Sequence, residues 1–313
     1  MLTFNDNHEY IQSLRDSGLG AADFQVAKAP VEFRIPTFAY DGSMIMDTIE
    51  YPSKEVYYRT DTNEPIAVHG LRYNPVQYSE MINKTRDMLE RSDLNYEDIE
   101  ENIQVSPNGG MCLVDYTLPA TNYETPDGDR GSVKVLALSS FNGVWSFILS
   151  LGFQQWACLN HQIMINNPAS IYKCRHTNKL NVDKGVNLLG QTANLIENEI
   201  ELWNEWANTY TSITETAKTF ASVSNYTGDI VELKDEIYKY GRPVNVKNKT
   251  LTYLYDVYNN TYKKTMGETQ WAVYNAITDW STHAPSSSKN VIALKQRRIE
   301  QATTAIQEWL KVA

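Results

Sequence analysis

The sequence predicts an α+β fold in which an antiparallel β-meander, covered by helices, precedes an all-α helical C-terminal region. Pairs of turn-forming residues recur at Asn108-Gly109, Asp127-Gly128 and Asn142-Gly143, and such pairs supply the positive φ angles of tight hairpin turns. Between these turns apolar and polar residues alternate, as they do in strands with one buried face. After Gly185 the apolar spacing changes to three and four residues, which is typical of helices.

The predicted meander lies between residues 102 and 152. Alternation places one apolar set on a strand near residue 115 and another on a strand near residue 148, with a third strand around residues 135–138. The two sets are Cys112, Val114, Tyr116 and Leu118, and Trp145, Phe147, Leu149 and Leu151. These spacings predict a four-stranded antiparallel sheet with one apolar face. Upstream, two β-rich runs at 56–60 and 66–69 predict a hairpin, and residues 75–90 predict a helix that covers the sheet.

From Leu189 to Phe220 apolar residues follow a helical repeat, which predicts one helix of more than thirty residues. A coiled coil and one arm of a bundle within the chain both fit this repeat. Trp203 and Tyr210 favour the bundle, because such side chains pack poorly in a coiled-coil seam. Further helices are predicted over residues 228–240, 248–263, 266–283 and 289–312.

Three regions follow from these patterns. Residues 1–55 show no sustained periodicity and contain Pro and Gly, which predicts an irregular arm with a short helix near residues 10–16. Residues 56–184 form the predicted α+β meander domain, and residues 185–313 form the helical domain.

Composition favours a folded cytoplasmic protein. The chain has 313 residues, of which 42% are hydrophobic, and a net charge of −10, which slows encounter with polyanions but permits a local basic groove. The first ten residues lack the pattern of a signal peptide. The longest apolar run, residues 144–153, is too short to cross a bilayer, so no membrane association is expected. Three cysteines without framework spacing fit free thiols in a reducing compartment.

The common catalytic and phosphate-binding motifs are absent from the sequence, including the P-loop, the dinucleotide fingerprint, the nucleophile elbow and the helical zinc motif. Cys158, His161, Cys174 and His176 have side chains that zinc accepts, but the second pair is too closely spaced for a usual finger. We therefore expect neither a metal nor a cofactor. Arg175-His176-Thr177 would suit a phosphate or carboxylate, and a polar network that joins two parts of the chain is an equally good interpretation.

The predicted helix at residues 266–283 has two different faces. One carries the apolar residues Val273, Ile277 and Trp280, and the other carries a polar stripe. A helix face exposed to water usually carries Lys and Glu, so a stripe of Trp, Asn and Thr indicates contact with something specific. The polar stripe comprises Trp271, Asn275, Thr278 and Thr282.

Five segments between about residue 56 and the C-terminus belong together: YRTDTNEPIAVHGLRYNPVQ, SSFNG, CLN at 158–160, RHT at 175–177 and GETQWAVYNAITDWSTH at 267–283. With them the chain resembles a family of phage/plasmid-like proteins that is defined by a domain of unknown function, number 932. If a phage encodes the chain, the expected compartment is the host cell cytoplasm. In the last segment the family pattern is matched at Gly267, Trp271, Asn275, Ala276, Thr278 and His283. Phe141-Asn142-Gly143 stands where the family usually has His-Asp-Gly, and Cys158-Leu159-Asn160 stands where it has Cys-Thr-Asn. The resemblance implies a mobile-element context without an established activity.

Two hypotheses about the site follow. The first is that the polar stripe packs against residues 158–177 and forms a shared polar site of Asn160, Trp271, Asn275, Thr278 and His283 beside the Arg-His-Thr tripeptide. The second is that basic residues contact phosphates of single-stranded nucleic acid, the expected partner. These residues are Lys173, Arg175, His176, Thr177, Lys179, Arg297 and Arg298.

The leading functional hypothesis is a single-stranded DNA binding or annealing protein acting in recombination. The order of helix, meander and helix looks like the core of Rad52-like and Redβ-like annealing proteins, in which these elements line a nucleic-acid groove. The alternatives are an enzyme that uses His176, Asn160, Asn275 and His283 as acid/base and orienting groups, and a homo-oligomeric assembly factor that associates through the helix at residues 186–220.

Overall fold

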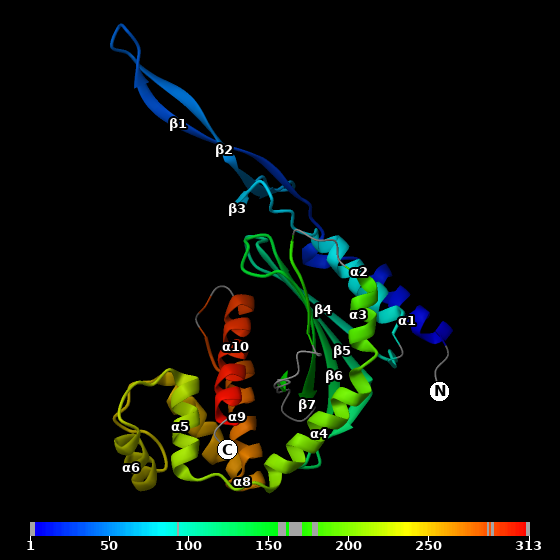
Figure 1. Ribbon diagram of the computed structural model, residues 1–313, viewed down its shortest axis with the longest axis vertical. Helices are drawn as coiled ribbons and strands as arrows, with labels where there is room; N and C mark the ends of the chain where they lie inside the picture. The colour runs from blue at the N-terminus through cyan, green and yellow to red at the C-terminus, as the bar shows by residue number, and fades with distance from the viewer. Residues whose placement is uncertain are drawn as a thin grey trace.

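The protein is described by a computed structural model that covers residues 4–92, 94–155, 161–162, 171–176, 181–286, 288 and 291–310. An antiparallel sheet lies between two groups of helices, and a long two-stranded ribbon projects from one end of the molecule (Figure 1). No helix among the described residues is long and apolar enough to span a bilayer.

The N-terminal region is regular, so the expectation of an irregular arm is wrong. Helix α1 (Phe4–Asp16) and a short 3-10 turn (Gly20–Ala22) precede the ribbon. The ribbon pairs β1 (Val26–Phe38) with β2 (Met44–Arg59), and β3 (Pro65–Gly70) pairs with the last part of β2, as the predicted hairpin requires. Pro30 and Pro36 obscured the pattern in the sequence. Both lie in β1, which is an edge strand, and edge strands tolerate proline because one side of the strand makes no ladder bonds.

The predicted four-stranded meander is confirmed. Its strands follow each other in chain order as antiparallel neighbours, and two short strands pair with the outer edge of the last one. The strands are β4 (Glu100–Val105), β5 (Met111–Glu124), β6 (Arg130–Ser140), β7 (Phe147–Gln155), β8 (His161–Gln162) and β9 (Ile171–Cys174). Cys174 pairs with Phe147, and Gln162 pairs with Phe153, so β9 and β8 lie at opposite ends of β7.

Both faces of the sheet are apolar, although the sequence predicted one. The expected face packs in the main core beneath α2 (Tyr78–Glu90), which confirms the predicted covering helix. The opposite face carries a second cluster against Ala293 of α10 (Val291–Leu310). This second cluster consists of Met111, Leu113, Leu138 and Trp145. Trp145 lies there and not beside Phe147 because it precedes β7, in the turn that follows Asn142-Gly143.

Three helices replace the predicted long one: α3 (Val182–Leu189), α4 (Thr192–Asn208) and α5 (Ile213–Ser224). The helix is interrupted at Gly190 and again before Ser212. The side chain of Ser212 forms a reciprocal capping box with Glu215. A capping box satisfies backbone N–H groups at a helix start, so α5 begins as a new helix at Ile213 even though the apolar repeat continues across the break.

The remaining predicted helices are confirmed within a few residues, and the helix predicted over 248–263 contains a π-helical segment (Tyr258–Tyr262). The helices are α6 (Ile230–Tyr240), α7 (Lys249–Val257), α8 (Lys263–Met266), α9 (Gln270–His283) and α10. Trp203 of α4 packs against the rings of Tyr123, Phe153 and Trp271, with 5.2–5.5 Å between ring centroids. One hydrophobic core therefore joins the sheet to the helical region, with no break near residue 185.

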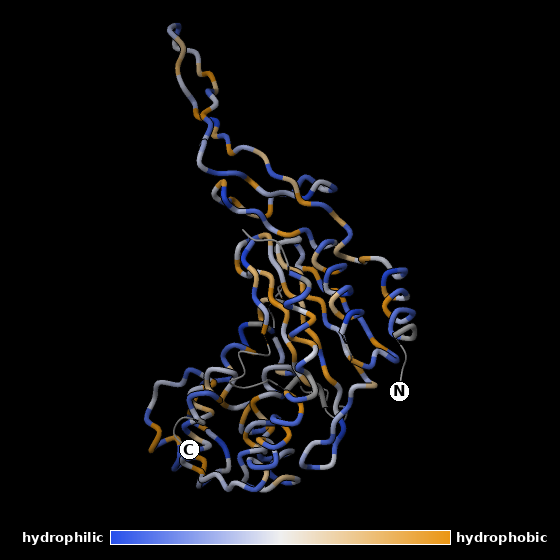
Figure 2. The backbone as a smooth tube through the Cα atoms, turned by 45° about the vertical axis from the view of Figure 1, so that its right-hand side comes forward, coloured by the Kyte–Doolittle hydropathy of each residue, from blue (hydrophilic) through white to orange (hydrophobic). Residues whose placement is uncertain are grey.

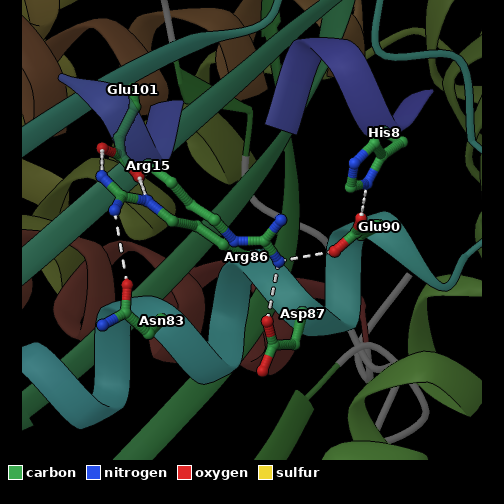
Figure 3. A network of polar contacts seen from close by, with 7 residues as sticks. All are labelled: His8, Arg15, Asn83, Arg86, Asp87, Glu90 and Glu101. Atoms are coloured by element: carbon green, nitrogen blue, oxygen red, sulfur yellow. Dashed lines mark hydrogen bonds and ion pairs between the residues drawn. The ribbon is translucent and has the colours of Figure 1, made fainter. Parts of the chain in front are cut away.

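An ionic network fixes α1 and α2 on the sheet (Figure 3). Arg86 makes a bidentate ion pair with Glu101, with nitrogen–oxygen distances of 2.9 Å and 2.5 Å, and both side chains are almost fully buried. Arg15 of α1 donates to Asp87 and Glu90 of α2, and His8 also contacts Glu90. Geometry of this bidentate kind holds a buried pair in one register.

Candidate nucleic-acid interface

A cluster of aromatic rings closes the end of the sheet at which β9 lies. His69 stacks on Tyr73 at 3.9 Å between ring centroids, and Tyr73 meets His176 edge to face at 5.2 Å. His69 Nε2 lies 2.8 Å from the Phe141 carbonyl oxygen, and Tyr73 donates to the Ser140 carbonyl at 2.9 Å. Three segments of the family resemblance, at residues 66–75, 139–143 and 175–176, therefore meet here around the turn that precedes β7.

His176 has a structural role in this cluster. Its side chain is buried, and its Nε2 lies 2.6 Å from the Trp145 carbonyl oxygen. Burial lowers the pKa of His176, and the nearby His69 adds a smaller effect in the same direction, so the neutral ring is favoured. Lys173, on β9, and Arg175, just after the strand, are exposed.

Three of the four residues in the polar stripe of α9 are sealed from solvent. Trp271 donates from Nε1 to Asp127 Oδ1 at 3.0 Å, Asn275 donates to the Trp271 carbonyl at 2.9 Å, and Thr278 donates to the Asn275 carbonyl at 3.0 Å. These three residues are buried, whereas Thr282 is half-buried. His283 lies at the end of the helix, with Nδ1 3.8 Å from Asp279.

The shared polar site is only partly formed. α9 contacts β8, at residues 161–162, as the hypothesis required. Arg175 and His176 follow β9 at the other end of β7, however, and the six residue steps of β7 from Phe147 to Phe153 separate the two ends by about 20 Å. The structure thus does not bring Trp271 and Asn275 to the Arg-His pair. Asn160, Thr177 and Lys179 lie outside the described residues.

The described part of the chain gathers no three His, Cys, Asp or Glu side chains in metal-binding geometry. Cys174 and His176 lie at the end of β9, while Cys158 falls outside the described ranges. Burial raises the pKa of Cys112 to about 12, which keeps its thiol protonated.

A basic pocket of about 790 Å³ lies in the helical region, where the ends of four helices meet. α5 ends at the pocket, α7 begins there, α9 leads into it, and the first half of α10 forms one wall. We call this feature the basic pocket. It is lined by Ser224, Asn225, Lys249, Thr250, Trp280, Pro285, Ser286, Leu294, Arg297, Arg298 and Gln301.

Local structure explains how the cations reach the basic pocket. Asn248 caps α7 by accepting from the Leu251 N–H and donates to the Ser224 carbonyl, which ties the start of α7 to the end of α5. Lys249, the first residue of α7, is exposed there. Gln301 of α10 donates to the Val223 carbonyl, so α10 is held along α5 with its basic residues facing the opening.

The two arginines of the basic pocket differ. Arg298 donates to the carbonyls of Ala284 at 2.6 Å and Pro285 at 3.1 Å, and its guanidinium lies 5.6 Å from the Trp280 ring centroid. Burial lowers the pKa of Arg298, but a guanidinium stays charged at any physiological pH. Arg297 is exposed at the opening. Arg298 therefore shapes the site, whereas Arg297 is available to a ligand.

Sequence reasoning named Arg297 and Arg298 but missed Lys249, Thr250 and Asn225. The Asn248 cap is visible in the sequence as a helix start signal. What brings it beside α10, nearly fifty residues later in the chain, is tertiary packing, and no local pattern encodes that.

These features define an α+β protein in which helices cover an antiparallel meander and carry a basic pocket. The chain belongs to the family described as Domain of unknown function (DUF932), whose model matches residues 65–307. No curated protein and no solved structure gives a significant match. The family match begins at β3 and includes the basic pocket, but it leaves out β1 and β2.

Proposed function

We propose that the protein binds single-stranded nucleic acid and that the basic pocket holds its phosphates. The observation that carries the proposal is the convergence of Lys249, Arg297 and Arg298 on one pocket. The described residues that line it include no Asp or Glu, although the chain as a whole has a net charge of −10. Three cations at one opening create a local positive potential that attracts an anionic ligand.

Size and chemistry favour a phosphate-bearing chain as this ligand. The volume of about 790 Å³ exceeds what an isolated inorganic anion needs and lies within the range of organic ligand sites. Hydroxyl and amide groups of Ser224, Asn225, Thr250 and Ser286 surround the cations and offer hydrogen bonds to phosphate and sugar oxygens. Such contacts carry no sequence information, so the expected binding tolerates any base sequence.

We extend the proposal to the annealing of complementary strands during recombination of phage or plasmid DNA. This extension depends on fold analogy: α2, the β4–β7 meander and the helices after it follow the order of the Rad52-like core. Two residues of the enzyme alternative, His176 and Asn275, are buried and engaged with backbone carbonyls, which weakens that alternative, and His283 lies at the end of α9 beside Asp279.

Binding of a fluorescent oligothymidylate, followed by anisotropy at low salt, tests the proposal. The variants are Lys249→Ala, Arg297→Ala and the two combined, since both side chains are exposed and hold no element in place. Lys264→Ala is the matched control, because this exposed lysine lies in α8 beyond the opposite end of α9. We expect the double variant to weaken binding by about tenfold and the control to bind as the wild type does. Absence of binding by the wild type, or an equal loss in the control, would refute the proposal.

A further inference from the structure

The outer part of the β1–β2 ribbon forms a separate structural unit. Pro30 pairs with Glu55, but the next residue, Val31, pairs with Tyr51, so three residues of β2 bulge out at this point. On one side of the bulge the ribbon contains the buried Val26 and Tyr57 and pairs with β3. On the other side the ribbon projects into solvent (Figure 1). We call this outer part, residues 31–51, the distal hairpin.

One face of the distal hairpin is apolar. Cross-strand partners share a face of a ribbon, and Val31 pairs with Tyr51, Phe33 with Ile49, and Thr37 with Ile45. Besides Thr37 and Asp47, this face carries six apolar residues, which are Val31, Phe33, Ile35, Ile45, Ile49 and Tyr51. The last five of these are 39–52% exposed, and hydrophobic segments alternate with hydrophilic ones along the ribbon in Figure 2. Eight cross-strand pairs make this face about 26 Å long.

A two-stranded ribbon that stands alone is marginally stable in water. An exposed face with six large apolar residues is also unusual in a monomer and indicates an interaction surface. The distal hairpin therefore needs a partner to cover it, and its charge restricts what that partner is. It carries four carboxylates, Glu32, Asp41, Asp47 and Glu50, against the single cation Arg34. An acidic apolar ribbon fits a basic apolar surface and is repelled by nucleic acid and by anionic lipid.

The body of the protein has such a surface around the cluster of His69, Tyr73 and His176. Leu71 and Val144 are 57% and 62% exposed there, and Arg72, Lys173 and Arg175 are exposed in the same segments. The three segments that form this surface, residues 65–75, 138–148 and 171–176, contain no Asp or Glu. We call it the basic apolar patch.

We propose that the distal hairpin of one copy docks on the basic apolar patch of a second copy of the same chain. The apolar face of the hairpin covers Leu71 and Val144, while Asp47 on the same face meets Arg72 or Arg175. Pairing of two hairpins face to face would instead bring like charges together. This contact joins two different surfaces, so it is heterologous. Each copy docks its distal hairpin on one neighbour and receives the hairpin of another, and the assembly closes as a ring or extends as a filament.

The test measures mass by light scattering over a concentration series for two variants. The donor variant, Phe33→Asp/Ile49→Asp, removes the apolar face of the distal hairpin. The acceptor variant, Leu71→Asp/Arg72→Glu/Arg175→Glu, removes the basic apolar patch. These side chains lie outside the buried core, so the body keeps its fold, which circular dichroism verifies. Val231→Asp, on an exposed position of α6, is the control.

We expect the wild type and the control to exceed the monomer mass of 35.7 kDa and each variant alone to be monomeric. An equimolar mixture of the two variants should form a dimer and nothing larger, because it contains one intact hairpin and one intact patch per pair. A wild type that stays monomeric at every concentration would overturn the proposal. An acceptor variant that still dimerises would show pairing of hairpins instead. Binding of the monomeric wild type to neutral lipid vesicles, lost in the donor variant, would assign the hairpin to a membrane.

Discussion

Trp271 donates a hydrogen bond from its indole Nε1 to Asp127 Oδ1 at 3.0 Å, across 144 positions of the chain. Asp127 lies in the turn between β5 and β6, and Trp271 is the second residue of α9. The bond fixes the start of α9 to the end of the sheet, while the indole packs against Trp203 and Tyr274. The polar stripe of α9 thus faces the interior, where it connects the helix to the sheet. Because this face does not meet water, it consists of Trp, Asn and Thr and has no charged residues.

Removal of this bond should destabilise the protein without unfolding it. We expect Asp127→Ala to lower the free energy of unfolding by about 1 kcal/mol, because it leaves the buried indole N–H without an acceptor. Trp271→Phe will cost more, since it also removes buried surface. Urea denaturation of both single variants and the double variant gives the coupling energy. A coupling energy near zero would mean that the bond between Trp271 and Asp127 does not stabilise the protein.

The turn before β7 should be sensitive to the size of residue 143. Gly143 has φ of +79°, and a Cβ built there lies 2.9 Å from the His69 ring. Gly128 has the same φ of +79° but open space around it, so it is a matched control. We expect Gly128→Ala to cost about 1 kcal/mol from backbone strain alone, and Gly143→Ala to cost about 1–3 kcal/mol more because the ring must move. Equal thermal melting temperatures for the two variants would contradict the packing of His69 on this turn.

Loss of one partner of the buried pair of Arg86 and Glu101 should destabilise the protein more than loss of both partners. Arg86→Met leaves the Glu101 carboxylate buried without its partner, at a cost of about 3–5 kcal/mol. The double variant Arg86→Met/Glu101→Leu should recover much of that loss, because it leaves no unpaired charge. Guanidinium denaturation measures the free energy of unfolding of both variants. A double variant less stable than the single one would show that the pair contributes more than neutralisation of its own charges.

Acidification should destabilise the protein through His176. The pKa of this buried ring is lowered by burial, so the unfolded chain binds the proton more readily than the folded protein does. The contribution of His176 is complete above its ordinary pKa of about 6.5 and is lost as the pH falls through that value toward the lowered pKa. Melting temperatures of the wild type and His176→Gln, compared from about pH 8 to about pH 5.5, should converge on acidification. Parallel pH profiles for the two proteins would refute the assignment.

The sequence predicted the meander because turn dipeptides and alternation are local signals. It also predicted α6, α7 and α9, which have strong caps at Asp229, Asn248 and Thr269. It predicted one helix for α3 to α5 because apolar spacing alone does not register a break. The Ser212 capping box, readable as Ser-Ile-Thr-Glu, was the overlooked signal.

The site was harder to predict from sequence than the fold. Helical spacing identified the α9 stripe as unusual, but the acceptor that explains it, Asp127, belongs to a turn that is explained, at the level of sequence, by turn chemistry alone. Likewise Arg297 was identifiable as basic, whereas its proximity to Lys249 depends on how α7 and α10 pack. Spatial convergence of this kind depends on packing between distant segments.

The salt dependence of oligonucleotide binding tests the central claim most directly. A plot of the logarithm of the association constant against the logarithm of salt concentration has a slope of about −0.7 per phosphate neutralised on a single strand. We predict that Lys249→Ala/Arg297→Ala makes this slope shallower by about 1.4, the value for two lost phosphate contacts, and that Lys264→Ala leaves it unchanged. An unchanged slope in the double variant, or no binding by the wild type at low salt, would contradict the assignment of the basic pocket to nucleic acid.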